Sequence, residues 1–123
     1  MIDISNVRPW NFYQNTNGNI GKVIGFDADS MGFLVVMQYH PNSTSFSRPN
    51  MLLPLPLTEA ILEKSGWQLK DGIWVKYGPI RVGWRPHSKE LIMGYHTLPF
   101  AVEFVSQLQN LLTDYGLNDD IVV

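Results

Sequence analysis

Residues 73–85 read IWVKYGPIRVGWR, and this segment predicts two β-strands. Apolar and polar side chains alternate on both sides of Gly78-Pro79, where proline lacks the N–H that a strand ladder requires. Such alternation is typical of a sheet with one covered and one solvent-exposed face. The side chains expected to face the core are Ile73, Val75, Ile80, Val82 and Trp84. A third strand at residues 90–95 completes a predicted β-meander.

An amphipathic helix is predicted after the meander, at residues 97–116. Thr97 is placed to cap it, Pro99 falls in its first turn, and Gly116 ends it. The apolar residues recur at spacings of four and three, which is the pattern of a helix with one buried stripe. They are Ala101, Val105, Leu108, Leu112 and Tyr115. We expect this stripe to pack on the sheet, and the tail at residues 118–123 to add an edge strand or to lie free.

The residues before the meander predict a short helix and a hairpin. The helix lies near residues 58–65, with Thr58 as its N-cap. The hairpin joins strands at residues 18–26 and 32–39, and the second strand is apolar on both faces, which predicts burial on both sides. The sequence therefore predicts an α+β fold, in which a small antiparallel β-sheet or barrel is packed by a C-terminal amphipathic helix. We expect residues 1–123 to form a single domain.

The composition of the chain bounds the class of protein. Hydrophobic residues make up 45% of the 123 residues and charged residues only 16%, so we expect a folded core and a surface that is partly covered. The absence of cysteine excludes disulfides, thiolate zinc sites and cysteine nucleophiles. No apolar run reaches the roughly 18 residues of a transmembrane helix, and residues 1–5 do not begin a signal peptide. We therefore expect a cytoplasmic protein with no membrane partner.

The positive charges are concentrated between Lys70 and Lys89, where five lysine and arginine residues accompany one acidic residue. The alternation in the predicted strands puts much of this charge on the face opposite the core. Arginine can bind phosphate through two parallel hydrogen bonds, and an aromatic ring can stack on a base. The residues predicted to bind an anionic ligand here are Trp74, Lys76, Arg81, Arg85 and His87. The alternative is an ordinary solvated strand face.

A second candidate set is aromatic. Trp10, Phe12 and Tyr13 lie close together in a polar segment that we expect to be a loop. Such rings can clamp a flat ligand, and Trp10 and Tyr13 are therefore also predicted to be ligand-binding residues. The alternative is that the rings close one end of a small barrel.

Two short motifs resemble those of a known group of proteins. The first is PLPLTE at residues 54–59, followed by Leu62, Lys64, Gly66 and Trp67, and the second is QLQNL at residues 107–111. With them, residues 54–116 resemble a family of small uncharacterised proteins from Bacteroidota genomes and their phages or mobile elements. Ser106 stands where that family has histidine. The resemblance implies a phage or mobile-element origin and implies no particular activity.

The sequence contains no nucleophile elbow, no phosphate-binding glycine loop and no metal-ligand spacing. It therefore favours a binding protein over an enzyme, without a cofactor or metal. The leading hypothesis is a protein that binds a small anionic, nucleotide-like molecule. In a phage-encoded protein, this would suit sequestering a host-defence signal in the host cytoplasm.

Two alternatives remain open. Residues 33–37 are apolar on both faces, which suggests a protein–protein adaptor or a homo-oligomer. The basic segment suggests a nucleic-acid-binding accessory protein, although the net charge of −2 disfavours nucleic acid as a partner.

Overall fold

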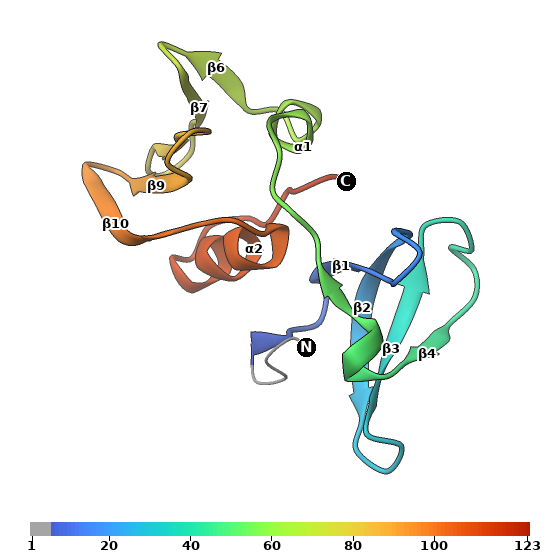
Figure 1. Ribbon diagram of the computed structural model, residues 1–123. Helices are drawn as coiled ribbons and strands as arrows, with labels where there is room; N and C mark the ends of the chain where they lie inside the picture. The colour runs from blue at the N-terminus through green and yellow to red at the C-terminus, as the bar shows by residue number, and fades with distance from the viewer. Residues whose placement is uncertain (1–5) are drawn as a thin grey trace. The chain divides into compact units, whose positions relative to one another are not determined.

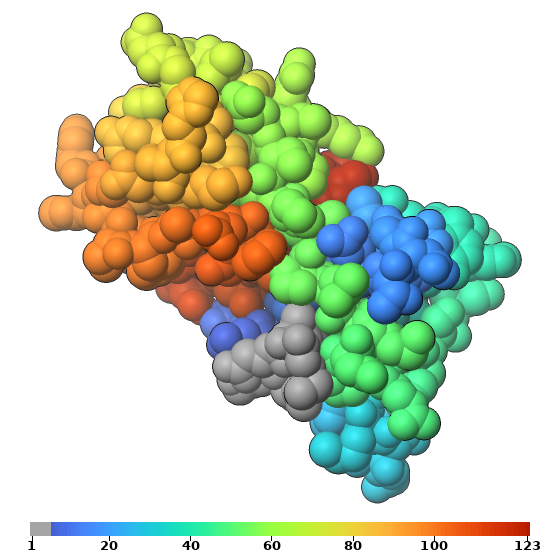
Figure 2. All heavy atoms as spheres, in the orientation of Figure 1, coloured from blue at the N-terminus to red at the C-terminus, as the bar shows by residue number. Residues whose placement is uncertain are grey.

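The computed structural model describes residues 6–123, so residues 1–5, part of the segment on which the absence of a signal peptide was predicted, lie outside the described residues. The chain forms two compact units, residues 1–55 (unit 1) and 56–123 (unit 2), each built around an antiparallel five-stranded sheet (Figure 1). With two α-helices, this confirms the predicted α+β fold. Neither sheet closes into a barrel within the described part of the chain. Figure 2 shows the surface of the two units with all heavy atoms drawn as spheres. The single-domain organisation stays a prediction.

Unit 1 contains the predicted hairpin at the centre of its sheet. The strands are β1 (Phe12–Gln14), β2 (Ile20–Asp27), β3 (Gly32–Met37), β4 (Ser45–Ser47) and β5 (Leu53–Pro54). Their order is β4-β3-β2-β1-β5, so the last strand pairs with the first. A 3-10 turn, η2 (Pro49–Met51), leads into β5. The core lies on one face of this sheet and consists of Tyr13, Val23, Phe33, Val35, Met37 and Leu52.

The prediction that β3 is buried on both sides is wrong for unit 1 taken by itself. Phe33, Val35 and Met37 are buried, but Leu34 is exposed and Val36 is only half-buried. Because side chains alternate along a strand, the exposed positions belong to one face of the sheet. We call the face that carries Leu34 and Val36 the outer face of unit 1.

Unit 2 is a meander with a helix before it and a helix after it. The elements are α1 (Glu59–Lys64), β6 (Gln68–Lys70), β7 (Ile73–Lys76), β8 (Val82–Trp84), β9 (Glu90–Met93), β10 (His96–Ala101) and α2 (Val105–Asp114). The sheet order is β10-β9-β8-β7-β6, so every strand pairs with its neighbours in the chain. Thr58 Oγ1 accepts a hydrogen bond from the N–H of Ile61 at 3.3 Å, which confirms the predicted N-cap.

The C-terminal helix is shorter than predicted. Its expected first turns form strand β10 instead, in which Thr97 pairs with Ile92 of β9, so Thr97 is not the cap. The helix begins where Gln107 Oε1 accepts hydrogen bonds from the N–H groups of Glu103 at 2.8 Å and Phe104 at 3.0 Å. From there the predicted stripe is correct for Val105, Leu108 and Leu112, which are all buried. It is wrong for Tyr115, which is 51% exposed, and for Ala101, which lies in β10. No helix among residues 6–123 is both long enough and apolar enough to cross a membrane.

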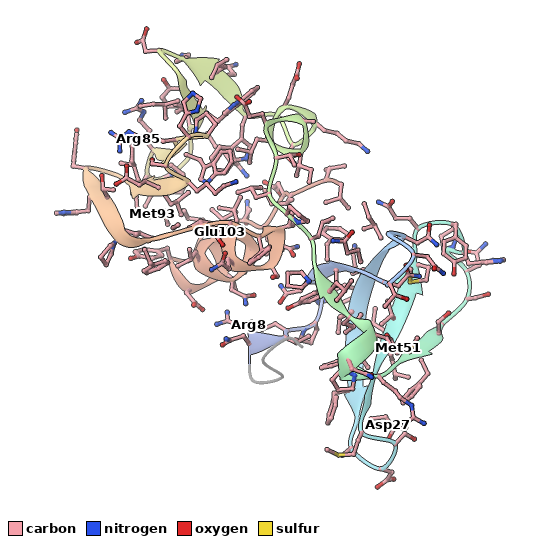
Figure 3. The ribbon with its side chains drawn as sticks, viewed as in Figure 1. Arg8, Asp27, Met51, Arg85, Met93 and Glu103 are labelled. Carbon is pink, nitrogen blue, oxygen red and sulfur yellow. The ribbon has the colours of Figure 1, made fainter. Side chains whose placement is uncertain are left out.

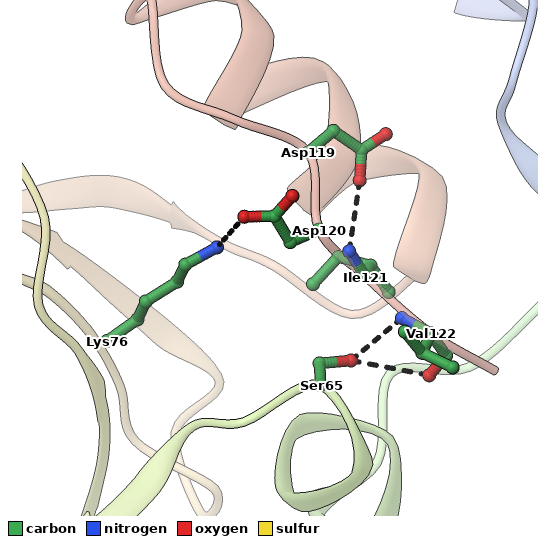
Figure 4. A network of polar contacts seen from close by, with 6 residues as sticks. All are labelled: Ser65, Lys76, Asp119, Asp120, Ile121 and Val122. Carbon is green, nitrogen blue, oxygen red and sulfur yellow. Dashed lines mark hydrogen bonds and ion pairs between the residues drawn. The ribbon is translucent and has the colours of Figure 1, made fainter.

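The tail of unit 2 neither adds a strand nor lies free. The side chain of Ile121 is buried, and Asp119 Oδ1 accepts a hydrogen bond from its N–H at 3.3 Å. Ser65 Oγ accepts a hydrogen bond from the N–H of Val122 at 2.9 Å (Figure 4). Lys64 Nζ of α1 donates a hydrogen bond to the carbonyl of Val123 at 2.8 Å, and Gln109 Nε2 of α2 donates one to Asp119 Oδ2 at 2.9 Å. The chain end is therefore bound to α1 and α2 of the same unit.

Candidate functional site

The pairing of β7 with β8 separates the residues that were predicted to share one basic, aromatic face. Trp74 lies directly opposite Trp84, and Lys76 lies opposite Val82. Residues directly opposite each other in an antiparallel pair lie on the same face of the sheet. Trp74 and Lys76 are therefore on the core face with Val82 and Trp84, while Arg81 alternates to the other face. The prediction of a single face containing all four residues is wrong.

Trp74 is part of the core of unit 2 and is not available for stacking. Its side chain is only 7% exposed, and its indole Nε1 donates a hydrogen bond to Glu59 Oε1 at 2.7 Å. A buried indole normally pairs its N–H in this way. Trp74 therefore has a packing role in unit 2.

Two of the predicted cations already have acidic partners. Lys76 Nζ lies 3.1 Å from Asp120 Oδ2, and Arg85 lies 3.6 Å from Glu90 Oε1. Arg85, which is labelled in Figure 3, is the residue directly after β8. His87 is exposed in the turn that follows and lines none of the hollows described below. These residues therefore do not form one cluster.

Arg81 is the predicted cation that lines a concave surface without an acidic partner. It borders a hollow of about 320 Å³, which we call the Arg81 hollow. The hollow is lined by Pro79, Ile80, Arg81, Gly94 and Tyr95. No carboxylate of residues 6–123 forms an ion pair with Arg81.

A larger hollow, of about 440 Å³, lies on the outer face of unit 1, and we call it the Trp10 hollow. Phe12, Lys22 and Val36 are directly opposite one another on β1, β2 and β3 and form a row across its floor. The complete lining is Trp10, Phe12, Lys22, Ile24, Val36, Met37, Gln38 and Pro41. Apart from Lys22, none of these side chains carries a formal charge.

The position of the Lys22 ammonium gives this hollow its chemical character. Lys22 Nζ lies 5.7 Å from the centre of the Trp10 ring and 5.1 Å from the centre of the Phe12 ring. Both distances are within the range of cation–π attraction. The hollow therefore combines two aromatic rings, an aliphatic floor and one positive charge.

The backbone holds Trp10 in an unusual conformation. Its φ is 74°, in the left-handed region that bulky residues seldom adopt. The N–H of Trp10 donates to the carbonyl of Val23 at 2.6 Å, and Arg8 (labelled in Figure 3) donates its N–H to Asn11 Oδ1 at 3.0 Å. These bonds fix the turn, and the indole is left 62% exposed.

The structure does not bring Tyr13 to the same place as Trp10. Tyr13 is one position after Phe12 on β1, so its side chain points to the opposite face, where it is buried in the core of unit 1. Lys22 was not among the predicted site residues. The sequence nevertheless points to it, because Lys22 alternates in step with Ile20 and Ile24 and is the charged residue among apolar ones on that side of the strand.

The described residues contain no group of three histidine, cysteine or acidic side chains that could hold a metal ion. No protein-family model matches the chain, and no curated protein and no solved structure is significantly similar to it.

Proposed function

We propose that this chain is a non-enzymatic protein that binds a small, flat, anionic molecule of the nucleotide type in the Trp10 hollow. One observation carries the proposal: the Lys22 ammonium lies within 6 Å of two aromatic rings, over a concave apolar floor. Stacking surface and positive charge are the two features that a base and its phosphate require. The volume of about 440 Å³ is in the range of small-molecule sites.

The binding mode follows from these positions. The base stacks on the exposed indole of Trp10 and contacts the aliphatic side chains of Ile24 and Val36. Lys22 leaves the rings and pairs with the phosphate, which replaces a cation–π contact worth about 0.5–1 kcal/mol at an exposed site with a charge-assisted hydrogen bond. A ligand without a negative charge cannot form this hydrogen bond with Lys22, so the hollow favours anions.

The strained backbone of Trp10 supports a binding role. A bulky residue in the left-handed region costs of order 1–3 kcal/mol, and such strain is concentrated at ligand sites. The hydrogen bond from the N–H of Trp10 to Val23 maintains this conformation before any ligand arrives. The indole is thus preorganised for stacking. A phage-encoded binder of this kind would lower the free concentration of a nucleotide signal without chemically changing it.

Calorimetry of the full chain against mono-, di- and cyclic nucleotides tests the proposal. Trp10→Ala should weaken binding by about 5- to 150-fold, since stacking on one base contributes roughly 1–3 kcal/mol. Lys22→Met should also weaken binding and remove its dependence on salt. Lys70→Met is the matched control, because Lys70 Nζ lies 4.7 Å from the Tyr77 ring but belongs to unit 2. No heat with any nucleotide would overturn the proposal.

A second candidate function, protein–protein association, has its own observation. Leu34 and Phe46 are directly opposite on β3 and β4 and are 36% and 45% exposed on the outer face of unit 1. Adjacent exposed apolar side chains are typical of an interaction surface. Light scattering of the chain and of Phe46→Lys tests this function. A monomer that captures no partner would count against it. The nucleic-acid alternative stays a prediction.

A further inference from the structure

The Arg81 hollow belongs to unit 2 and has no part in the proposed function, which uses unit 1 alone. The alternation of side chains along the strand determines which residues line this hollow. Val82 faces the core, so Arg81 faces the opposite side of the sheet, together with Gly83. Gly83 itself is covered, because a Cβ there would lie 3.1 Å from Ile73 Cγ2 and 3.6 Å from Ile92 Cδ1. A ligand on this side therefore meets Arg81 and not the open backbone.

A backbone hydrogen bond holds the other wall of the hollow beside Arg81. The N–H of Gly94 donates to the carbonyl of Arg81 at 2.7 Å, which joins the tight turn between β9 and β10 to the start of β8. Gly94 has a φ of 64°, as such a turn requires. Tyr95, the next residue, is fully exposed, at 101% of its reference area. An arginine and a tyrosine thus border one concavity with the apolar residues Pro79 and Ile80.

The charge of Arg81 is not neutralised within the described chain. Lys76 is paired with Asp120 and Arg85 with Glu90, whereas no carboxylate of residues 6–123 pairs with Arg81. A planar guanidinium has five N–H donors, which match two oxygens of a phosphate at once. A tyrosine ring provides an apolar face for whatever carries the phosphate.

We propose that the Arg81 hollow binds a phosphate monoester carried on an aromatic stem. Arg81 binds two phosphate oxygens, and the stem lies against the ring of Tyr95 and the side chain of Ile80. This site is independent of the Trp10 hollow and would remain if the nucleotide proposal failed.

A nuclear magnetic resonance titration of the full chain with phenyl phosphate tests this second site. We expect shifts at the amides of Gly94 and Tyr95, weaker binding of inorganic phosphate, and no binding of phenol. Arg81→Gln should weaken phenyl phosphate binding by about tenfold or more, since a hydrogen bond to a charged group is lost. Arg81→Lys should retain part of the affinity, because an ammonium cannot form the two parallel bonds.

Arg85→Gln is the matched control, because it removes the same charge from the same sheet but outside the hollow. It should change the affinity by less than about twofold, as expected for an exposed, ion-paired residue. An equal loss for Arg85→Gln and Arg81→Gln would overturn the proposal, since binding would then follow the general positive charge. Equal affinities for inorganic phosphate and phenyl phosphate would overturn the role of Tyr95 and Ile80. Trp10→Ala should leave this titration unchanged, which separates this test from the nucleotide test.

Discussion

The two units of this protein use tryptophan in opposite ways. Unit 2 contains Trp67, Trp74 and Trp84, and all three are buried, whereas Trp10 of unit 1 is 62% exposed. The buried indoles of Trp84 and Trp74 donate to the carbonyl of Val102 at 3.0 Å and to Glu59. Residue type alone therefore does not distinguish a buried ring from an exposed one. The strand register and the local backbone conformation decide which role each ring has.

Among the proposed substitutions, Trp84→Ala should destabilise the protein most, and a small effect would contradict the packing role of the buried indoles. The side chain is almost completely buried, so the substitution removes a large apolar surface and leaves a cavity. We expect the free energy of unfolding to fall by about 3–5 kcal/mol, as measured by urea denaturation.

Trp10→Ala is the matched control for Trp84→Ala. An exposed ring contributes little to the core, so the loss is mainly that of its cation–π contact with Lys22, and the free energy of unfolding should change by less than about 1 kcal/mol. Equal losses for the two variants would mean that Trp10 is also a packing residue, which would contradict its proposed role in ligand binding.

The β7–β8 segment shows which structural features could be predicted from the sequence and which could not. Val82 and Trp84 were predicted correctly to face the core, but Ile80, predicted to face it with them, precedes β8 and is exposed. The phase of β7 was predicted from Val75, whose side chain is indeed buried, but Trp74 is the residue opposite Trp84. Register depends on the geometry of the turn at residues 77–81, and a shift of one residue moves every side chain to the other face. The pattern within each strand does not contain that information.

The helix α2 and the Trp10 hollow differ in how well they could be predicted from the sequence. The buried stripe of α2 was predictable because it repeats with the helical period. The start of α2 was not, because Thr97 fits a helix cap equally well but pairs with Ile92 in β10. The Trp10 hollow depends on Lys22 lying opposite Phe12, a contact between strands that no local pattern specifies.

Trp74→Phe tests the hydrogen bond of a buried indole separately from the burial of its ring. Phenylalanine retains most of the apolar surface but cannot donate to Glu59 Oε1. We expect a loss of about 1–2 kcal/mol, since the acceptor is charged but lies near solvent. Urea denaturation of Trp74→Phe, Glu59→Gln and the double variant measures the coupling energy. Additive losses would show that the 2.7 Å contact contributes nothing.

Asp120→Asn should have the smallest effect on the free energy of unfolding. It removes an exposed ion pair from a unit whose stability comes mainly from buried apolar side chains. Lys76 and Asp120 lie 3.1 Å apart, but the Asp120 side chain is mostly exposed, so the loss should be below about 1 kcal/mol and should disappear in 1 M salt. Asp71→Asn removes the same charge from unit 2 at a residue that forms no ion pair with residues 6–123, and it should cause no salt-dependent loss. If Asp120→Asn instead destabilises the protein by several kcal/mol, the ion pair and not the burial of Ile121 holds the tail, and unit 2 would depend on its surface charges as much as on its buried indoles.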